Sequence, residues 1–318
     1  MNYHTNHSVK RPAAAGFAAL LLLLNMSATE AQDVERAPDH ADVTYATVGQ
    51  QPLKLDLYLP DAVGAASPET TAYPPPLVVW LHGGAWRFGS KANPPLRFLE
   101  AGFALASVDF RPSTDAPFPA MLHDVKAAIR FLRANAGRYG YAPGPMAVAG
   151  ASSGGHLAAL AAVTNGDAAL EGGVGDHAGV SSAVQAAVVY FGASNLTTIL
   201  DQSTPFGLDV RRPALELLLG AAPDAAADVA RLASPVFHVD AEDPPMYLLH
   251  GDQDLQMPIN QAHELHGAYK AAGLDAALDV VHGAGHGGDA FYDDQHWAPT
   301  AEFLRRVLVA APTHGEGS

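Results

Sequence analysis

The clearest indication of the fold is the sequence MAVAGASSGGHLA at residues 146–158. It is typical of a short apolar strand, followed by a Gly-x-Ser-x-Gly turn at residues 150–154, followed by the start of a helix. Small residues on either side of Ser152 suit a turn so tight that Cβ atoms there would collide. Such a turn exposes a hydroxyl at the carboxyl edge of a sheet, so Ser152 is the candidate nucleophile. Ser153 is a rival hydroxyl, but it is off the centre of the motif, and its backbone N–H is its more useful group.

On both sides of this motif, short apolar runs alternate with longer helical stretches. This alternation predicts an α/β fold with a mostly parallel central sheet and helices on both faces. Two alternating stretches, 43–48 and 53–59, are expected to form an antiparallel N-terminal edge joined by a turn at 49–51. Strands buried on both faces are expected at 77–81, 103–108, 146–149, 186–190, 246–249 and 278–281, and helices at 120–136, 154–163, 258–272 and 299–311.

The sequence contains no internal repeat and no compositional break between two halves. We therefore expect a single domain over residues 33–312. Two stretches fit the alternation poorly: the Gly-rich 164–182, and 194–232, where prolines interrupt short helical pieces. Long insertions in an open α/β sheet commonly cover the ligand crevice, so both are expected to be cap-like.

The composition narrows the possible functions. The 318 residues are 48% hydrophobic and 16% charged, which is enough apolar material for a large core. The formal net charge of −15 repels phosphate backbones, and the sequence has no basic stripe, so no nucleic-acid partner is expected. The absence of cysteine excludes thiol catalysis and disulfides.

The first 31 residues resemble a secretory signal peptide. Lys10 and Arg11 precede an apolar run at 12–24, and Thr29-Glu30-Ala31 suits cleavage after Ala31. The alternative is a membrane anchor, but a spanning helix needs about 20 apolar residues, more than this run provides. We expect a secreted or periplasmic protein with no membrane attachment after cleavage.

A second motif, WLHGGAW at residues 80–86, ends an apolar strand. Acyl transfer needs N–H donors aimed at a developing oxyanion, and consecutive small residues let backbone amides approach a substrate closely. We expect the oxyanion hole to use the amides of Gly83, Gly84 and Ser153.

Three neighbours of these glycines have other expected roles. Ala85 is expected beside the substrate, where it can also supply an amide. Trp86 is expected to line the acyl or alcohol side of the crevice, with a core position as the alternative. His82 is expected to brace the loop.

A serine nucleophile needs a base, and the base needs an acid that holds its tautomer. The sequences MYLLHGDQD at 246–254 and VVHGAGHG at 280–287 supply both groups just past apolar strands. In each pair of candidates the later residue lies deeper in the loop and can turn over the sheet edge. The expected triad is therefore Ser152, Asp254 and His286, with Asp252 as a turn or capping carboxylate and His282 as a strand-end residue.

These motifs, in this order, resemble the exported esterase and lipase group of the α/β-hydrolases. That group includes feruloyl- and acetylxylan-esterase-like enzymes and is related to hormone-sensitive-lipase-type esterases. The resemblance covers most of the chain after residue 31. The residues that carry it are 82–86, 109–112, 116–120, 124–125, 150–154, 234–235, 250–254, 257–258 and 283–287.

The resemblance implies hydrolysis of carboxylic esters with no metal or organic cofactor. The implied substrate is a small-molecule ester with a short acyl chain or an aryl or hydroxycinnamoyl group, including acyl groups linked to plant polysaccharides. Ala85 departs from the family pattern, because many relatives have Gly there, and this changes the room for substrate. The acid motif is more similar to the feruloyl-esterase-like and oligopeptidase-like branch than to the lipase-like branch.

Two other functions are alternatives: an amidase- or peptidase-like serine hydrolase, and a non-catalytic ligand-binding protein on a hydrolase scaffold. Oligopeptidase-like relatives normally carry a propeller, which the residues before the first parallel strand are too few to form. A binding scaffold normally lacks a triad residue, and all three are present in this sequence. The sequence leaves the oligomeric state open.

Two further sets of charged residues call for a structural interpretation. Arg111 and Asp124 are expected to brace a loop as an ion pair. Carboxylates and a histidine late in the chain could hold calcium or zinc, but their spacing fits neither an EF-hand nor a helical two-histidine motif, so a solvated loop is expected. These residues are Asp289, Asp293, Asp294 and His296.

Overall fold

The computed structural model describes residues 36–61 and 74–309 of the chain. The sheet and its helices belong to a compact unit that begins at Ala37. The expected signal peptide at residues 1–31 lies outside the described residues. None of the helices in the described ranges combines the length and the apolar character that crossing a membrane requires.

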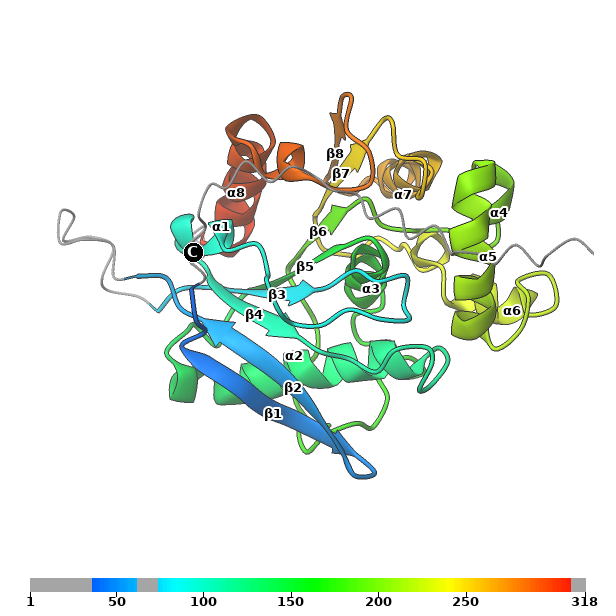
Figure 1. Cartoon of the computed structure of the whole chain (residues 1–318). Helices are drawn as coiled ribbons and strands as arrows, with labels where there is room; N and C mark the ends of the chain where they lie inside the picture. Colours follow the sequence, from blue (N-terminus) through cyan, green and yellow to red (C-terminus); the bar gives the residue numbers. More distant parts are fainter. Residues whose placement is uncertain (1–35, 62–73, 310–318) are drawn as a thin grey trace, which may run out of the picture. The chain divides into compact units, whose positions relative to one another are not determined.

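The centre of the fold is an eight-stranded sheet with the order β1-β2-β4-β3-β5-β6-β7-β8 (Figure 1). β1 pairs antiparallel with β2, and β2 antiparallel with β4, whereas every other pair is parallel. The expected mostly parallel sheet with an antiparallel N-terminal edge is therefore confirmed. The strands are β1 (His40–Val48), β2 (Gln51–Tyr58), β3 (Leu77–Leu81), β4 (Ala104–Val108), β5 (Met146–Ala151), β6 (Ala186–Tyr190), β7 (Met246–Gly251) and β8 (Ala276–Val281).

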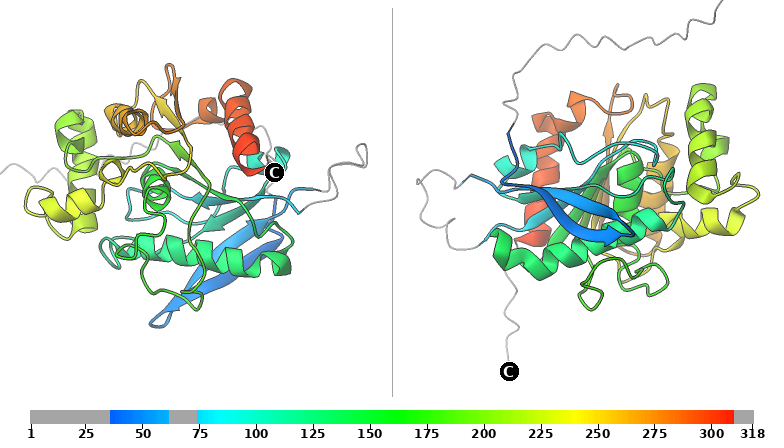
Figure 2. Two further views of the ribbon diagram at one scale, coloured as in Figure 1. Left: turned by 180° about the vertical axis from the view of Figure 1, so that it is seen from behind. Right: turned by 60° about the horizontal axis from the view of Figure 1, so that its bottom comes forward.

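Helices cover both faces of this sheet, as Figures 1 and 2 show. The side chains of β3 alternate between two separate apolar clusters: Leu77 and Val79 belong to one, and Val78 and Trp80 to the other. The first cluster includes residues of α2, α3 and α7, and the second includes residues of α1 and α8. The α-helices are α1 (Arg97–Glu100), α2 (Ala120–Tyr139), α3 (Ser153–Ala162), α4 (Ile199–Gln202), α5 (Pro205–Leu219), α6 (Ala227–Leu232), α7 (Asn260–Ala271) and α8 (Asp294–Leu308), and the 3₁₀ helices are η1 (Pro235–Phe237) and η2 (Asp289–Tyr292).

The last strand differs from its expected environment. We expected residues 278–281 to be buried on both faces, but in β8 only the first and last residues, Ala276 and Val281, are buried. The reason is its position, because β8 pairs with β7 alone and forms an edge of the sheet. An apolar run indicates a strand but does not say whether the strand is central.

The first insertion, residues 164–182, packs along α2: Gly172 lies against His123 in the first turn of that helix, and Gly175 lies close to Ala46 of β1. It joins the end of α3 to the start of β6, and just after it the amide of Gln185 donates to the carbonyl of Met146 at the start of β5 (2.8 Å). The cap-like role expected of this segment stays a prediction.

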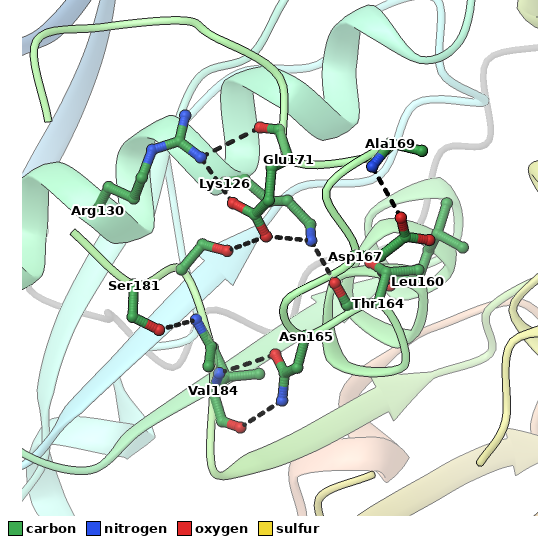
Figure 3. A network of polar contacts seen from close by, with 12 residues as sticks. Lys126, Arg130, Leu160, Thr164, Asn165, Asp167, Ala169, Glu171, Ser181 and Val184 are labelled. Carbon is green, nitrogen blue, oxygen red and sulfur yellow. Dashed lines mark hydrogen bonds and ion pairs between the residues drawn. The ribbon is translucent and has the colours of Figure 1, made fainter. Parts of the chain in front are cut away.

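A buried charge cluster holds this insertion against α2 (Figure 3). Glu171 accepts hydrogen bonds from Lys126 (2.7 Å) and Arg130 (2.9 Å), whose side chains are almost fully buried. Asn165 makes a reciprocal pair of hydrogen bonds with the backbone of Val184. The segment has no regular secondary structure, and these contacts fix its path.

The second insertion, residues 194–232, forms α4, α5 and α6 at the carboxyl edge of the sheet. It follows β6, and the Oγ1 atom of Thr204 donates to the carbonyl of Leu255 (2.8 Å), next to the predicted catalytic acid. Thr204 also caps α5, since its hydroxyl accepts the amide of Gly207 (3.0 Å), and Pro205 occupies the first turn. Of the two insertions, this one borders the candidate site.

Candidate active site

Ser152 lies at the turn between β5 and α3, in a backbone conformation rarely adopted by residues other than glycine. Its φ is 56° and its ψ is −119°. Its amide donates to the carbonyl of Tyr190 at the end of β6 (2.9 Å), which ties the turn to the neighbouring strand. Strain of this kind persists only where the surroundings enforce it, and it clusters at functional sites.

The two glycines of the Gly-x-Ser-x-Gly motif are required by close backbone contacts. A Cβ atom on Gly150 would lie 2.4 Å from the carbonyl oxygen of Gly154, and one on Gly154 would lie 2.1 Å from that of Leu81. The expected collision of Cβ atoms is thus confirmed. The second contact also presses the turn against the end of β3, where the loop with the predicted oxyanion amides begins.

The structure brings the three predicted triad residues together from three loops at the carboxyl edge. Nε2 of His286 lies 2.8 Å from Oγ of Ser152, and Nδ1 lies 2.6 Å from Oδ2 of Asp254. The parallel pairing of β5, β6, β7 and β8 produces this convergence, because it places the ends of β5, β7 and β8 at one edge.

The Asp254 side chain is fully buried and satisfied by several donors. Its Oδ1 accepts the amides of Gln256 and Met257, each at 2.8 Å, while His286 and His250 reach Oδ2. Burial opposes ionisation of Asp254, but the hydrogen bonds from the two histidines and the positive charge that His286 can carry hold its pKa well below the ordinary value. Asp254 is therefore a carboxylate.

The ionised acid determines the tautomer of His286. A carboxylate only accepts hydrogen bonds, so the Nδ1 atom of His286 carries a proton and donates it to Asp254. In the neutral ring Nε2 then has a free lone pair, which accepts the hydroxyl proton of Ser152. The ring of Phe191 packs edge-on against His286, with centroids 4.8 Å apart, and restricts its movement.

The predicted oxyanion loop lies directly against Ser152. A Cβ atom on Gly83 would be 3.3 Å from Cβ of Ser152, so the backbone approaches the serine closely. Positive φ angles at Gly84 (126°) and Ala85 (51°) turn the loop sharply. In the part of the chain that the structure describes, no acceptor pairs with the amides of Gly83 and Gly84, or with that of Ser153 in the first turn of α3.

Trp86 does not have its expected position at the wall of the crevice. Its side chain is 1% exposed and belongs to the core beneath the loop. Its Nε1–H donates to Nδ1 of His156 (3.0 Å), and Nε2 of His156 donates to the carbonyl of Ala233 (2.6 Å). Burial lowers the pKa of His156 to about 4, which keeps the imidazole neutral as this bridge requires. Trp86 also has a positive φ (60°).

His82 and Ala85 lie on either side of the predicted oxyanion glycines. His82 stacks on Phe110 with ring centroids 4.4 Å apart, and its Nδ1 lies 2.7 Å from the carbonyl of Gly83. The bracing role expected of His82 is confirmed. Ala85 is partly buried and packs against the core cluster.

The rival candidates for the triad have other positions. The hydroxyl of Ser153 is buried, and in the described part of the chain it has no hydrogen-bond partner. Asp252 accepts the amide of Gly283 and pairs with Nδ1 of His282, each at 2.8 Å, at the surface. Asp252 is thus the expected turn carboxylate.

The other charged residues singled out from the sequence have structural contacts. Arg111 makes a two-pronged ion pair with the fully buried Asp124, with both distances at 2.7 Å, and so braces its loop as expected. Asp293 caps the start of α8, and Asp294 pairs with Arg97 (2.8 Å). Within residues 36–61 and 74–309, no group of three His, Asp or Glu side chains is arranged to hold a metal ion.

Two further residues at this site, His250 and His156, were not predicted from the sequence. Both are fully buried, and each hydrogen-bonds to backbone near a site loop. The sequence signal for His250 is its position at the end of a buried strand. The signal for His156 is its position shortly after the predicted nucleophile.

The sheet, with Ser152, Asp254 and His286 in loops at its carboxyl edge, has an α/β-hydrolase fold. Within that class, the chain belongs to the BD-FAE family, whose model matches residues 55–269. The matched range includes Ser152 and Asp254 and ends before His286.

Similar proteins include several named esterases. Esterase LipQ of Mycobacterium tuberculosis is 32% identical over 79% of this chain and 57% of its own length. A solved carbohydrate esterase from gut microbiota, in truncated form, is 30% identical, with a TM-score of 0.75, over 86% of this chain and all of that one. Esterase 2 of Thermogutta terrifontis, phosphonylated by sarin, is 26% identical, with a TM-score of 0.69, over 87% of this chain and 98% of its own. This chain spans about half the length of the curated relatives that it matches.

Proposed function

We propose that this protein is a serine carboxylesterase that works through an acyl-enzyme intermediate. The observation that carries the proposal is the His286 ring, hydrogen-bonded to Ser152 through Nε2 and to the buried carboxylate of Asp254 through Nδ1. The esterase names of the similar proteins support ester bonds as the substrate.

In the first step, Oγ of Ser152 attacks the ester carbonyl carbon while its proton passes to Nε2 of His286. The carbonyl oxygen becomes an oxyanion that accepts hydrogen bonds from the amides of Gly83, Gly84 and Ser153. Asp254 stabilises the imidazolium that forms. When the tetrahedral intermediate collapses, the bond to the alcohol oxygen breaks and His286 returns the proton to the leaving alcohol.

Water then removes the acyl group in a second step. His286 accepts a proton from water as the water oxygen attacks the acyl carbon, and the same amides stabilise the second oxyanion. Collapse breaks the bond to Oγ of Ser152, which recovers its proton from His286. The product is a carboxylic acid and the enzyme is regenerated.

The proposed substrates are esters with short acyl chains or aryl or hydroxycinnamoyl groups. The only α-helices of the described insertion at the carboxyl edge are α4, α5 and α6, and none forms a long apolar lid of the kind that interfacial lipases use. The carbohydrate esterase among the similar structures supports acyl groups linked to polysaccharides as part of this range.

The test compares wild type with Ser152→Ala on nitrophenyl acetate, butyrate and octanoate and on methyl ferulate. Loss of the nucleophile is expected to lower kcat by about a million-fold, to the background of the assay. Ser153→Ala is the matched control, because it removes the neighbouring hydroxyl and leaves the amide in place. Turnover by folded Ser152→Ala at the wild-type rate would overturn the proposal, and faster turnover of octanoate than of acetate and butyrate would overturn the short-chain preference.

A covalent probe tests the activated serine without reference to any ester. The esterase 2 structure is phosphonylated by sarin, and we expect a fluorophosphonate probe to label this protein in the same chemical manner. Wild type is expected to gain one label on Ser152, and Ser152→Ala none. Absence of labelling in folded wild type would favour a binding protein on a hydrolase scaffold.

We also propose that the protein is exported and cleaved after Ala31. The proposal rests on the basic residues and the apolar run before Ala31. N-terminal sequencing of protein from periplasm and medium is expected to begin at Gln32. A chain that still begins at Met1 in the membrane fraction would show the anchor instead.

A further inference from the structure

The buried face of α5 contains one charged side chain, Arg211. The other buried residues of this helix are glycine, alanine and leucine, and they repeat with helical spacing. Arg211 is 3% exposed, whereas the adjacent Arg212 is on the solvent face. A cation therefore occupies a position where the pattern of the helix calls for an apolar residue.

The guanidinium of Arg211 has no partner in the described part of the chain. Its Nε and Nη2 atoms are buried and without a hydrogen bond, and none of the ion pairs among the described residues includes it. The buried Arg130 pairs with Glu171, and the partly buried Arg111 pairs with Asp124. Burying an unpaired charge costs free energy, so we expect a partner from outside the chain to pair with Arg211.

The position of α5 places Arg211 beside the triad. The first turn of α5 packs against the loop of the catalytic acid, because a Cβ atom on Gly207 would lie 2.8 Å from the carbonyl oxygen of Leu255. Gly207 and Arg211 are one turn apart on the same face of the helix. At the other end of the helix, Leu218 accepts the amide of Phe118 (2.8 Å), so α5 is fixed at both ends.

Electrostatics agree with this position. Burial lowers the pKa of Arg211 to about 10, and the carboxylate of Asp254, close enough to act on it, opposes that shift. The side chain is therefore a cation at neutral pH. Asp254 cannot serve as its partner, because the donors described above already occupy both of its oxygens.

We propose that Arg211 is a specificity residue that binds the carboxylate of an acidic ester, one in which the acyl or the alcohol half carries a carboxylate group. A guanidinium is a planar fork that matches a carboxylate in two parallel hydrogen bonds. The proposal rests on the esterase function proposed above and deepens it by naming a substrate class.

Exposed apolar side chains on α5 and on the loop after Asp254 suit the rest of such a substrate. Phe206 in the first turn of α5 is 55% exposed, and Leu255 next to Asp254 is 59% exposed. The hydrogen bond from Thr204 to Leu255 joins the two segments that carry them.

The test uses two pairs of esters that differ in one carboxylate. Ethyl hydrogen adipate and ethyl hexanoate place the difference in the acyl half, and 4-acetoxybenzoate and phenyl acetate place it in the alcohol half. Values of kcat/KM are measured for wild type, Arg211→Gln and Arg211→Lys, with Arg212→Gln as the matched control that removes a charge from the outer face of the same helix.

Arg211→Gln is expected to lower kcat/KM about tenfold or more for at least one acidic ester, and less than about twofold for its neutral counterpart. Arg211→Lys keeps the charge but not the fork, so its loss is expected to be smaller. Arg212→Gln is expected to leave kcat/KM unchanged for the acidic and the neutral esters. Equal effects of Arg211→Gln on the acidic and neutral members of both pairs would overturn the proposal while leaving the esterase function intact.

A binding measurement separates this proposal from a failure of the esterase function. Adipate is expected to raise the thermal unfolding temperature of wild type and of Ser152→Ala, but not of Arg211→Gln. Without ligand, Arg211→Gln is expected to unfold at the same or a higher temperature than wild type, because it removes an unpaired buried charge. A marked fall in that temperature, with no adipate effect in wild type, would assign Arg211 a structural role instead.

Discussion

Nε2 of His250 lies 3.4 Å from Oδ2 of Asp254, the same oxygen that accepts the hydrogen bond of His286. His250 also donates to the carbonyl of Met257 (2.9 Å), so its single N–H is shared between the acid and the turn that follows it. His250 thus contacts the same carboxylate oxygen as the predicted catalytic imidazole. It acts through Asp254 and is a positioning residue.

Replacing His250 should therefore affect turnover more than substrate binding. His250→Phe removes the donor, and we expect kcat to fall by about tenfold with KM within about twofold of wild type. His250→Gln keeps an N–H donor and is expected to lose less. An unchanged kcat in a folded His250→Phe protein would show that Asp254 does not need this contact.

Substitution of Asp254 and substitution of Asp252 should have very different effects on kcat. Asp254→Asn removes the charge that stabilises the imidazolium and fixes the tautomer of His286, so kcat should fall by about ten-thousand-fold. Asp252→Asn changes a surface carboxylate that pairs with His282, and its kcat should stay within about twofold. Steady-state kinetics on nitrophenyl butyrate would distinguish the two, and equal losses would reject the assignment.

The buried His156 should make stability fall in mild acid. Its pKa is about 4 in the fold against an ordinary 6.5, so the unfolded chain binds the proton first as the pH falls. Stability is then lost between pH 6.5 and about 4, and is unaffected by this group above 6.5. The full effect is about 3 kcal/mol, since one pKa unit corresponds to about 1.4 kcal/mol.

The measurement is urea unfolding of wild type and His156→Asn at pH 7.5, 6, 5 and 4.5. Burial raises the pKa of Asp243 to about 6, which acts in the opposite direction over the same range, so the relevant quantity is the difference between the two proteins. That difference should shrink as the pH falls. A difference that is constant with pH would contradict the neutral bridge between Trp86 and Ala233.

Because Gly154 contacts β3 closely, adding one methyl group there should greatly lower the free energy of unfolding. In Gly154→Ala the new Cβ would lie 2.1 Å from the carbonyl oxygen of Leu81, so the turn must shift, and we expect destabilisation of about 3 kcal/mol or more. Gly137→Ala is the control, because no atom lies within 4 Å of its Cβ and it is an exposed position in α2. That change should stabilise by about 1 kcal/mol. Thermal unfolding of both variants checks the contrast.

Much of this fold could be predicted from the sequence because its strands are marked by pattern. The expected strands at 77–81 and 186–190 agree with β3 and β6, since continuous apolar runs between helices have few other interpretations. The Gly-x-Ser-x-Gly motif predicted the turn at Ser152, because close backbone contacts at Gly150 and Gly154 leave no room for a Cβ atom.

Other features depend on side-chain directions and on residues distant in the sequence, which no local sequence pattern predicts. The side chain of Trp86 lies in the core, and its backbone has a positive φ that its residue type does not suggest. The unpaired state of Arg211 becomes apparent only once its distant neighbours are in place. The location of 164–182 depends on which end of α3 it follows, and not on its glycine content.

The first insertion, residues 164–182, is also a suitable site for attaching a label to this protein. Lys126 and Arg130 of α2 anchor the segment through Glu171. Gly173 and Gly179 beyond that anchor are exposed, with no atom within 4 Å of a Cβ added at either. A peptide tag or a single engineered cysteine placed there could link the protein to a fluorophore or a solid support.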